Sequence, residues 1–600
     1  MLRTLNVGER RRRMGDYARA VTVRLLRPAK TGAMAAAAAV LLAGGAPRAL
    51  AQTPPLLDSA TQPKFTQPLP IPSVIEPTVP WGTHYEVSVS QFQQDLGLVD
   101  PVTGAPLLTW LWGYNGTYPG PTFEAFRDRP ITVRWNNDLI EDGRPLPHLL
   151  PVDTSLDFAA SECWPWCGVP LVTHLHGGHT ESESDGLPDA WFTPGFAETG
   201  PTFIKGDVEP YRYDNDQEAA TMWYHDHAMG LTRLNVYAGL AGVYLIRDAW
   251  EQSLLLPRGP YEIPLLIQDR MFTANGQVFL PSAPPVPGAP AISVQPGFFG
   301  NVIVVNGKAW PVLNVKPRKY RFRVVNASDT RFYRLTLPKA NGHKGPKMHQ
   351  IGTDLGLLDA PLNVTQLLLA PGERADVVID FSGFEGQTLI LRNSAQTPFP
   401  QGPAPDPATT GQVMAFRVGS SWVRDTSQLP RRLRPRFAQN ACPEPISATR
   451  QLIVGDMPDS FGRRMFMLGT AEEGMMHWMD PITENPTLGA TEVWEIFNMH
   501  GNVHPIHLHL VNFRILDRQE FHATMDPTTG ALTDIQLLGE PTPPERWEAG
   551  PKDTVQLAPH QVTRIIAKFD RPGDYVWHCH ILQHEDHEMM RPIYVAASPP

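Results

Sequence analysis

Fifteen residues near the end of the chain, Trp577–Arg591, constrain most strongly what this sequence can fold into. They read WHCHILQHEDHEMMR and bring together one thiol, four imidazoles and two thioethers. The preceding GDYVW is aromatic and β-branched, which predicts that His578-Cys579-His580 leaves a strand in extended form. Side chains alternate between the two faces of a strand, so Cys579 should face one way and both flanking histidines the other.

This alternation predicts two metal sites joined by one tripeptide. A cysteine with two histidines and a weak methionine ligand is typical of a blue-copper electron-transfer centre. His584 and Met589 follow Cys579 closely enough to return to it on a loop or short helix. His578 and His580 would then face a second site that binds imidazole.

The segment HPIHLH supplies a further ligand for each site. His504 lies three residues before His507 and cannot share its strand face. Pro505 between them is expected to redirect the backbone. His504 is therefore free to join the cysteine site, whereas His507 and His509 should face the other one.

Four H-x-H elements occur in the chain, each beside strand-like sequence, although the twenty histidines would give fewer than one such pair by chance. They are His174/His176, His225/His227, His507/His509 and His578/His580. Both members of each pair should share a strand face. Imidazole-rich sites suit zinc, copper, iron or nickel, and a lone thiolate favours copper because structural zinc sites normally hold more thiolates. The nearby His179 and His587 are interpreted as neighbours or surface residues rather than ligands.

Length and composition favour several β-domains. A chain of 600 residues is too long for one core, and its 62 prolines, 48 glycines and short Val/Ile/Leu/Phe runs indicate β-sandwiches with long loops. We expect domains at 52–250 and 449–600, both carrying metal ligands, a middle domain without ligands at 251–420, and a linker at 421–448. A Met-rich stretch, residues 465–479, is interpreted as core filling, with a copper(I)-handling surface as the alternative.

The first 51 residues read as a secretory signal. Arg10–Arg13 precede the apolar run Ala33–Ala43, and Ala49-Leu50-Ala51 offers a cleavage site. Translation starting at Met14 or Met34, and export by the twin-arginine route, remain open. The expected location is therefore the periplasm or the medium, with no membrane span. The net charge of −10 argues against a nucleic-acid partner.

Three cysteines besides Cys579 remain in a chain expected to be exported. One disulfide among Cys163, Cys167 and Cys442 is predicted, and the pairing is open. A C-x3-C zinc or redox site at Cys163 and Cys167 is the alternative.

The motifs HLHGG, WYHDH, HPIHLH and HCHILQHEDHEMM resemble the four copper-binding motifs of multicopper oxidases, especially bacterial spore-coat-type laccases and bilirubin oxidases. The similarity extends to SDGLPDAWF and LAPGERADVVIDF, and so covers nearly the whole chain after residue 51. It implies an all-β fold of three cupredoxin-like Greek-key β-sandwiches, with a trinuclear copper cluster between the first and third.

The same resemblance implies four copper ions with distinct ligands. A type 1 copper would take His504, Cys579, His584 and axial Met589. A type 2 copper would take His174 and His507, and two type 3 coppers would take His176, His225, His227, His509, His578 and His580. The division of the eight cluster histidines between copper types follows from the resemblance alone.

The implied activity is a laccase-like oxidation of phenols or aromatic amines by a monomer, with four electrons passed to dioxygen to form water. Electrons would travel from Cys579 to His578 and His580. Asp185 and Glu585 match acidic residues that deliver protons in similar laccases, and a solvated surface acid is the alternative for each. Bilirubin, aminophenols and metal ions such as Cu(I), Mn(II) or Fe(II) remain alternative substrates. A non-catalytic cupredoxin scaffold should have lost ligands, and a nitrite reductase should show a two-copper pattern, so neither fits.

Overall fold

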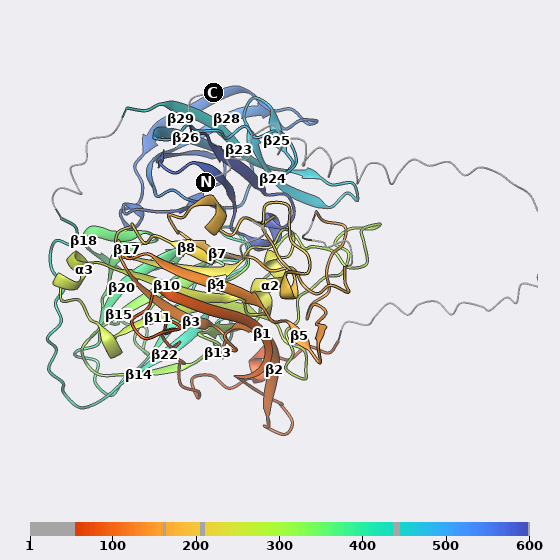
Figure 1. Cartoon of the computed structure of the whole chain (residues 1–600). Helices are drawn as coiled ribbons and strands as arrows, with labels where there is room; N and C mark the ends of the chain where they lie inside the picture. Colours follow the sequence, from red (N-terminus) through yellow and green to blue (C-terminus); the bar gives the residue numbers. More distant parts are fainter. Residues whose placement is uncertain (1–53, 158, 160–163, 204–209, 436–444, 598–600) are drawn as a thin grey trace, which may run out of the picture. The chain divides into compact units, whose positions relative to one another are not determined.

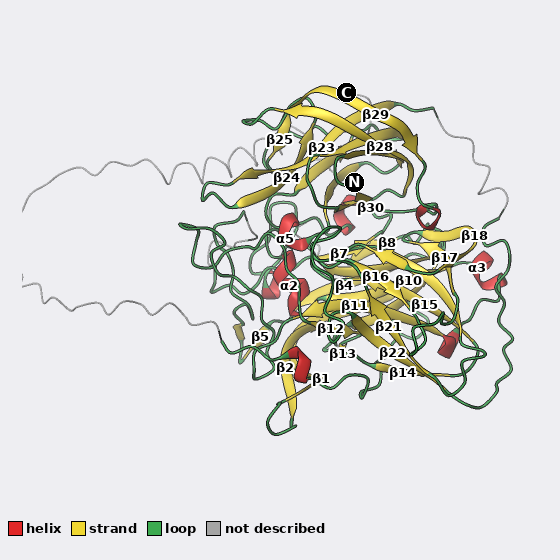
Figure 2. Cartoon of the chain, turned by 180° about the vertical axis from the view of Figure 1, so that it is seen from behind, coloured by secondary structure: helices red, strands yellow, loops and turns green. Residues whose placement is uncertain are grey.

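The computed structural model describes residues 54–157, 159, 164–203, 210–435 and 445–597. Strands dominate these residues, and the helices are short (Figure 2). The α-helices are α2 (Thr232–Ala238), α3 (Ala249–Ser253) and α5 (Leu582–Glu585). The predicted all-β class is confirmed. The expected leader lies outside the described residues, and within them no helix is both long and apolar enough to cross a membrane.

The first pair of sheets comes from residues before 250. One has the order β2-β1-β4-β8 and the other β3-β10-β9-β7. Their bounds are β1 (His84–Val99), β2 (Pro106–Tyr114), β3 (Gly120–Phe126), β4 (Ile131–Asn137), β7 (Thr173–His176), β8 (Tyr211–Tyr213), β9 (Ala220–Asp226) and β10 (Ala241–Arg247), with the small hairpin β5 (Ile140–Glu141) and β6 (Arg144–Pro145) beside them. β4 alternates buried and half-buried residues, whereas β7 and β9 are buried throughout. Complete burial shows that β7 and β9 are covered on both faces.

The middle part of the chain forms a seven-stranded and a five-stranded sheet around the largest apolar cluster. The first has the order β13 (Lys308–Ala309), β12 (Val302–Val305), β11 (Glu262–Arg270), β15 (Lys319–Asn326), β20 (Arg374–Asp380), β17 (Met348–Thr353) and β18 (Gly356–Val364). The second has the order β14 (Val312–Val315), β22 (Gln412–Val418), β21 (Thr388–Asn393), β16 (Tyr333–Thr336) and β19 (Leu367–Leu369). Most of these strands are labelled in Figure 1 in the green part of the colour range.

The last part of the chain, blue in Figure 1, forms the third pair of sheets. The larger runs β25 (Gly474–Met476), β24 (Arg464–Thr470), β23 (Ala448–Pro458), β26 (Ala490–Asn498), β31 (Gln561–Phe569), β28 (Phe513–Met525) and β29 (Leu532–Thr542). The smaller runs β30 (Thr554–Leu557), β27 (His504–Leu508), β32 (Gly573–Cys579) and β33 (Met590–Val595). The described residues from 54 onward group into one compact unit, so the predicted domain limits stay a prediction.

The expected redirection of the backbone at Pro505 is wrong. β27 runs from His504 through Pro505 to Leu508, and Pro505 stands opposite Gln556 of β30. Strand parity alone places His504 and His507 on opposite faces, because they are three positions apart. β27 also pairs with β32, with His507 opposite His578, which brings two of the H-x-H elements side by side.

Candidate metal centres

One buried site gathers a thiol and two imidazoles. Sγ of Cys579 lies 3.6 Å from Nδ1 of His504 and 3.8 Å from Nδ1 of His584. His504 begins β27, Cys579 ends β32, and His584 lies on the short helix α5. With metal–sulfur and metal–nitrogen bonds of about 2.3 and 2.0 Å, these separations correspond to angles of roughly 115° and 125° at one shared metal. The sulfur can therefore share one metal with each imidazole nitrogen, and all three donor atoms lie within 4.8 Å of one another.

The surroundings of this site are apolar. Cys579 and Met589 are fully buried in the same hydrophobic cluster, which also contains Ile506 and Trp577. The N–H of Cys579 donates to the carbonyl of Met589 at 3.0 Å, which holds the segment carrying Met589 against the end of β32. Burial raises the pKa of the Cys579 thiol. A bound cation would reverse this effect, because a coordinating thiol is deprotonated.

Eight histidines form a second buried cluster. Nε2 of His578 lies 3.3 Å from Nε2 of both His227 and His509, and Nε2 of His580 lies 3.2 Å from Nδ1 of His176. Two nitrogens 3.3 Å apart, each about 2.0 Å from a metal, subtend an angle near 110°. The groups whose donor atoms converge are His174/His176/His507, His176/His225/His580 and His227/His509/His578. Together they contain all eight members of the four H-x-H elements.

The free nitrogens of this cluster fit metal ligation. Nε2 of His174, His225 and His507 are buried and have no hydrogen-bond partner among the described residues. Their Nδ1 atoms face backbone carbonyls: His174 that of Asp185 at 2.5 Å, His225 that of Asp226 at 2.9 Å, and His507 that of Asp553 at 2.9 Å. Metal-binding histidines typically donate their other N–H in this way, which fixes the ring and its tautomer. Unpartnered buried nitrogens are otherwise costly.

Burial lowers the pKa of several cluster histidines and so favours their neutral form. It lowers the pKa of His225 and His227 to about 3, and neighbouring histidines contribute to the shift. The same cause lowers the pKa of His176 and His580 well below the usual value. A neutral imidazole offers the lone pair that a metal needs.

Both acids predicted near the cluster contact its histidines. Asp185 places Oδ2 2.6 Å from Nδ1 of His509, and burial raises its pKa to about 8. Glu585 lies with Oε2 3.1 Å from Nδ1 of His578 and Oε1 3.5 Å from Nδ1 of His227. Burial also raises the pKa of Glu585, and neither of its carboxyl oxygens makes a well-directed hydrogen bond within the described chain. The solvated-acid alternative is therefore wrong for both.

Several predicted residues lie outside the two sites. His179 bonds to Asp216 and Asp570, and His587 lies 3.3 Å from Asp459, and neither belongs to a converging group. Cys167 is disulfide-bonded, whereas Cys163 and Cys442 lie outside the described residues. Met465, Met467 and Met476 are buried in the core, as expected of gap-filling methionines, whereas Met479 is exposed.

Sequence reasoning missed four residues around the clusters: His500, Gly372, Arg374 and Asp553. His500 bonds to His504, and Asp553 bonds to His176. Gly372 and Arg374 come from the middle part of the chain, which was expected to act as a spacer. Charged residues inside the strand-like run LAPGERADVVIDF were the available signal, because charges are buried only with partners.

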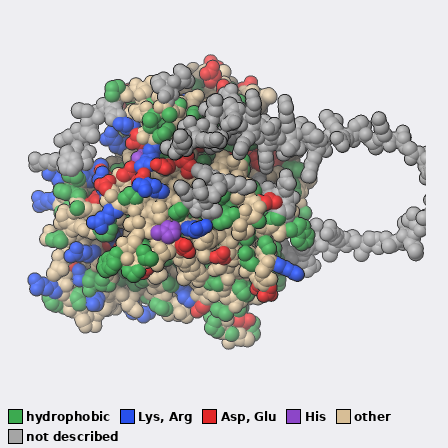
Figure 3. Space-filling view, viewed as in Figure 1, with side chains coloured by type: hydrophobic (Ala, Val, Ile, Leu, Met, Phe, Trp, Pro, Cys, Tyr) green, Lys and Arg blue, Asp and Glu red, His purple; other side chains and the backbone are tan. Residues whose placement is uncertain are grey.

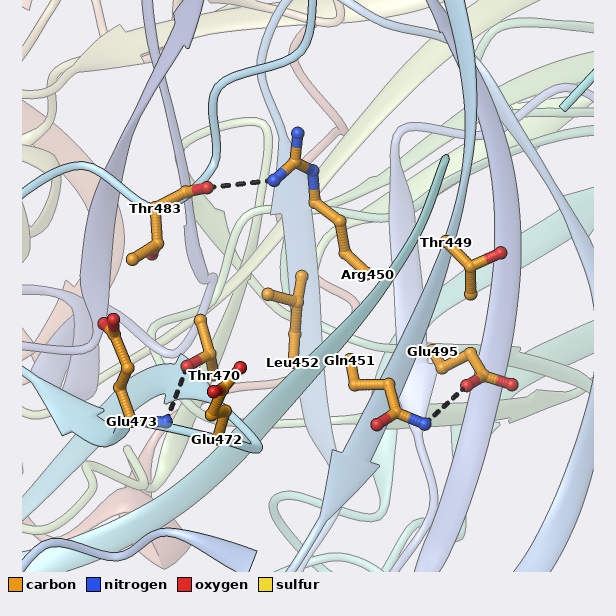
Figure 4. Close-up of a pocket in the computed structure, with 9 residues that line it drawn as sticks. All are labelled: Thr449, Arg450, Gln451, Leu452, Thr470, Glu472, Glu473, Thr483 and Glu495. Carbon is orange, nitrogen blue, oxygen red and sulfur yellow. Dashed lines mark hydrogen bonds between the residues drawn. The ribbon is translucent and has the colours of Figure 1, made fainter. Parts of the chain in front are cut away.

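The surface offers no competing metal site among the described residues. On the face shown in Figure 3, acidic and basic side chains are interspersed and histidine surfaces in isolated spots. A pocket of about 530 Å³ lies on the third pair of sheets. Figure 4 shows its lining, in which Gln451 bonds to Glu495 and Arg450 to the carbonyl of Thr483. None of its lining residues is a histidine or cysteine, so the pocket is separate from both clusters.

Comparison with known proteins agrees with this geometry. Two family models described as multicopper oxidase match residues 169–251 and 448–599. A laccase of Bacillus subtilis is 44% identical over 88% of this chain and 98% of its own length, and a laccase of Haloferax volcanii is 36% identical over 90% and 86%. The crystal structure of a laccase from Pediococcus acidilactici superposes with a TM-score of 0.64 at 26% identity, covering 90% of this chain and 96% of that one. The chain therefore belongs to the multicopper oxidase family.

Proposed function

We propose that this multicopper oxidase is laccase-like and couples one-electron oxidation of small aromatic substrates to reduction of dioxygen to water. The observation that carries the proposal is the pair of sites on either side of one tripeptide. The Cys579 sulfur lies within 3.8 Å of two imidazole nitrogens, whereas its neighbours His578 and His580 lie in the eight-histidine cluster. The relatives from Bacillus subtilis and Haloferax volcanii reported above carry the name laccase.

The proposed ligands are those expected from the sequence. A type 1 copper would be held by His504, Cys579 and His584, with Met589 as a further, weak ligand. The remaining coppers are assigned to the cluster, the type 2 ion to His174 and His507 and the type 3 pair to His176, His225, His227, His509, His578 and His580. When bound, these ions accept single electrons from the substrate and deliver four to dioxygen.

The protein's own groups orient the ligands, exclude water and supply protons. Backbone carbonyls and Asp185 hold the outer nitrogens of the cluster histidines, and the cluster is buried throughout. Water formation consumes protons, so acids within reach of the cluster are required. Asp185 and Glu585 are proposed for this role because burial raises the pKa of each, so that each retains a proton at higher pH than an ordinary carboxyl.

Copper-loaded full-length protein should test the proposal. It should bind four copper ions, show the intense thiolate-to-copper absorption and consume one dioxygen for every four molecules of a methoxyphenol oxidised by one electron each. Fully loaded protein without that absorption would contradict the Cys579 assignment. Turnover of bilirubin, an aminophenol and Mn(II), measured beside the phenol, ranks the substrate classes. Size-exclusion chromatography tests the proposed monomer, and fractionation of the native host tests the proposed export.

A further inference from the structure

The loop between β19 and β20 reaches the histidine cluster from the middle part of the chain. A Cβ added to Gly372 would lie 2.7 Å from Cδ2 of His580 and 3.2 Å from Cε1 of His176. The backbone of Gly372 is also left-handed, with φ of +83°. Two independent constraints therefore require glycine at position 372. Any side chain would strain the left-handed backbone, and it would also clash with two imidazole rings. The loop forms part of the wall of the cluster.

Arg374, two residues further on, joins the three parts of the chain at one point. Its side chain is fully buried. Nε donates to the carbonyl of Thr221 in β9 at 2.9 Å, and Nη2 to that of Asp354 at 3.2 Å. The guanidinium also donates to both carboxylate oxygens of Asp553, at 2.6 and 2.5 Å. The planar fork of arginine suits such a two-point contact.

Asp553 in turn contacts two histidines of the cluster. Its Oδ1 lies 3.1 Å from Nε2 of His176, and its backbone carbonyl lies 2.9 Å from Nδ1 of His507. A carboxylate can only accept hydrogen bonds. His176 must therefore carry its proton on Nε2, which leaves the lone pair of Nδ1 facing Nε2 of His580 at 3.2 Å.

We propose that Arg374 and Gly372 are positioning residues for the trinuclear copper cluster. The Arg374–Asp553 pair fixes which nitrogen His176 turns toward the metal, and Gly372 sets how close His176 and His580 lie to the loop. The inference rests on the proposed ligand roles of His176 and His580. It gives the middle part of the chain a direct function at the oxygen-reducing site, in addition to spacing the other two parts.

A second ion pair at the same junction provides a control. It distinguishes an effect on the orientation of the copper ligands from a general loss of stability at the junction. Glu373, between the two proposed residues, forms an ion pair with Lys552 at 3.0 Å and accepts a hydrogen bond from Gln556 at 2.6 Å. Its carboxyl is buried and joins the middle part of the chain to the last part. None of its hydrogen bonds or ion pairs in the described structure involves a histidine. Glu373→Gln therefore perturbs the junction without touching the cluster.

The experiment compares Arg374→Gln, Arg374→Lys, Gly372→Ala and Glu373→Gln in copper-loaded full-length protein. Copper content, the blue absorption, the electron paramagnetic resonance of the type 2 ion, the near-ultraviolet band of the type 3 pair and thermal stability are measured for each. Arg374→Gln and Gly372→Ala should weaken copper binding at the cluster by about 10–100-fold. Both should alter the type 2 and type 3 signals and keep the blue absorption.

Two control variants, Glu373→Gln and Arg374→Lys, show whether a changed signal reflects ligand positioning. Glu373→Gln should lower thermal stability and leave every copper signal unchanged, and Arg374→Lys should restore part of the cluster signals. Unchanged cluster signals in both Arg374→Gln and Gly372→Ala would overturn the inference. If Arg374→Gln does not fold, unchanged signals in Gly372→Ala and Arg374→Lys overturn it equally. Wild-type protein without a type 3 signal would instead refute the ligand assignment itself.

Discussion

His504 and His500 share a hydrogen bond of 3.1 Å between Nε2 of His504 and Nδ1 of His500. Nδ1 of His500 also accepts the backbone N–H of Asn502 at 3.2 Å, so it carries no proton. The proton of the shared bond therefore belongs to Nε2 of His504. This arrangement leaves Nδ1 of His504 unprotonated on the side of the Cys579 sulfur, where a metal ligand is required.

We predict that His500→Phe disturbs the copper site at Cys579. The ring of Phe fills a similar volume but cannot accept the proton of His504, so this ligand loses its fixed tautomer. Copper affinity or activity should fall by about 10–100-fold, as for other residues that orient metal ligands. The blue absorption and the reduction potential of the site report the change. His500→Gln, which keeps an acceptor, is the control, and a His500→Phe protein with wild-type absorption and potential would contradict the prediction.

Cys579→Ser should separate the two metal sites. Serine keeps the strand but replaces the thiol, so the blue absorption and turnover should disappear. The cluster histidines keep their partners, and their copper should stay bound. Metal analysis and electron paramagnetic resonance measure both effects. Loss of all copper from the variant would show that the sites are not independent.

Glu585→Gln should slow oxygen reduction. Burial raises the pKa of Glu585, so this group holds a proton at higher pH than an ordinary carboxyl and loses it as the pH rises. Removal of a general acid typically costs about 10²–10⁴-fold in rate. We expect kcat to fall by this order, with KM for the reducing substrate and copper content unchanged. The pH–rate profile should also lose the decline that deprotonation of Glu585 causes on its alkaline side. An unaltered kcat at all pH values would exclude the role.

A surface ion pair network should make stability depend on pH. Burial alone would lower the pKa of His179, yet hydrogen bonds to Asp216 and Asp570 raise it to about 9. Because the folded pKa lies above the unfolded value of 6.5, the contribution is complete below about pH 6.5 and is lost as the pH rises through about 9. His179→Gln should therefore destabilise the protein by about 3 kcal/mol near pH 6 and far less above pH 9.

Denaturant or thermal unfolding at several pH values checks this window. His343→Gln, which changes an exposed histidine of the middle part of the chain, serves as the control. Asp214 and Arg571 also face the network, and Arg571 bonds to Asp216 at 2.7 Å. A loss of stability in His179→Gln that is equal at pH 6 and pH 10 would contradict the assignment of the effect to the charge of His179.

The sequence predicted the sites where short-range periodicity decides side-chain direction. His578, Cys579 and His580 lie on alternate faces because β32 is extended, and the helix α5 returns His584 to the sulfur. The roles of Arg374 and Gly372 depend on contacts with Asp553 and His580, some 180 to 210 positions away in the chain. Such contacts leave no periodic trace in one sequence. For Pro505 a local rule gave a wrong prediction. The rule that proline interrupts a strand predicted a change of backbone direction, but β27 continues through Pro505 because it pairs with β30 and β32.

The bond between His176 and His580 joins residues that are 404 positions apart. Because the ribosome synthesises the chain from its N-terminus, His176 is made long before His580, and the contact between them can form only when synthesis is almost complete. Contacts of such long range also form late in folding, since the closure entropy of the intervening chain must be overcome first. A chain that ends before β27 consequently lacks four of the eight cluster histidines, His507, His509, His578 and His580. We therefore expect the complete eight-histidine cluster to exist only after the C-terminal strands have docked.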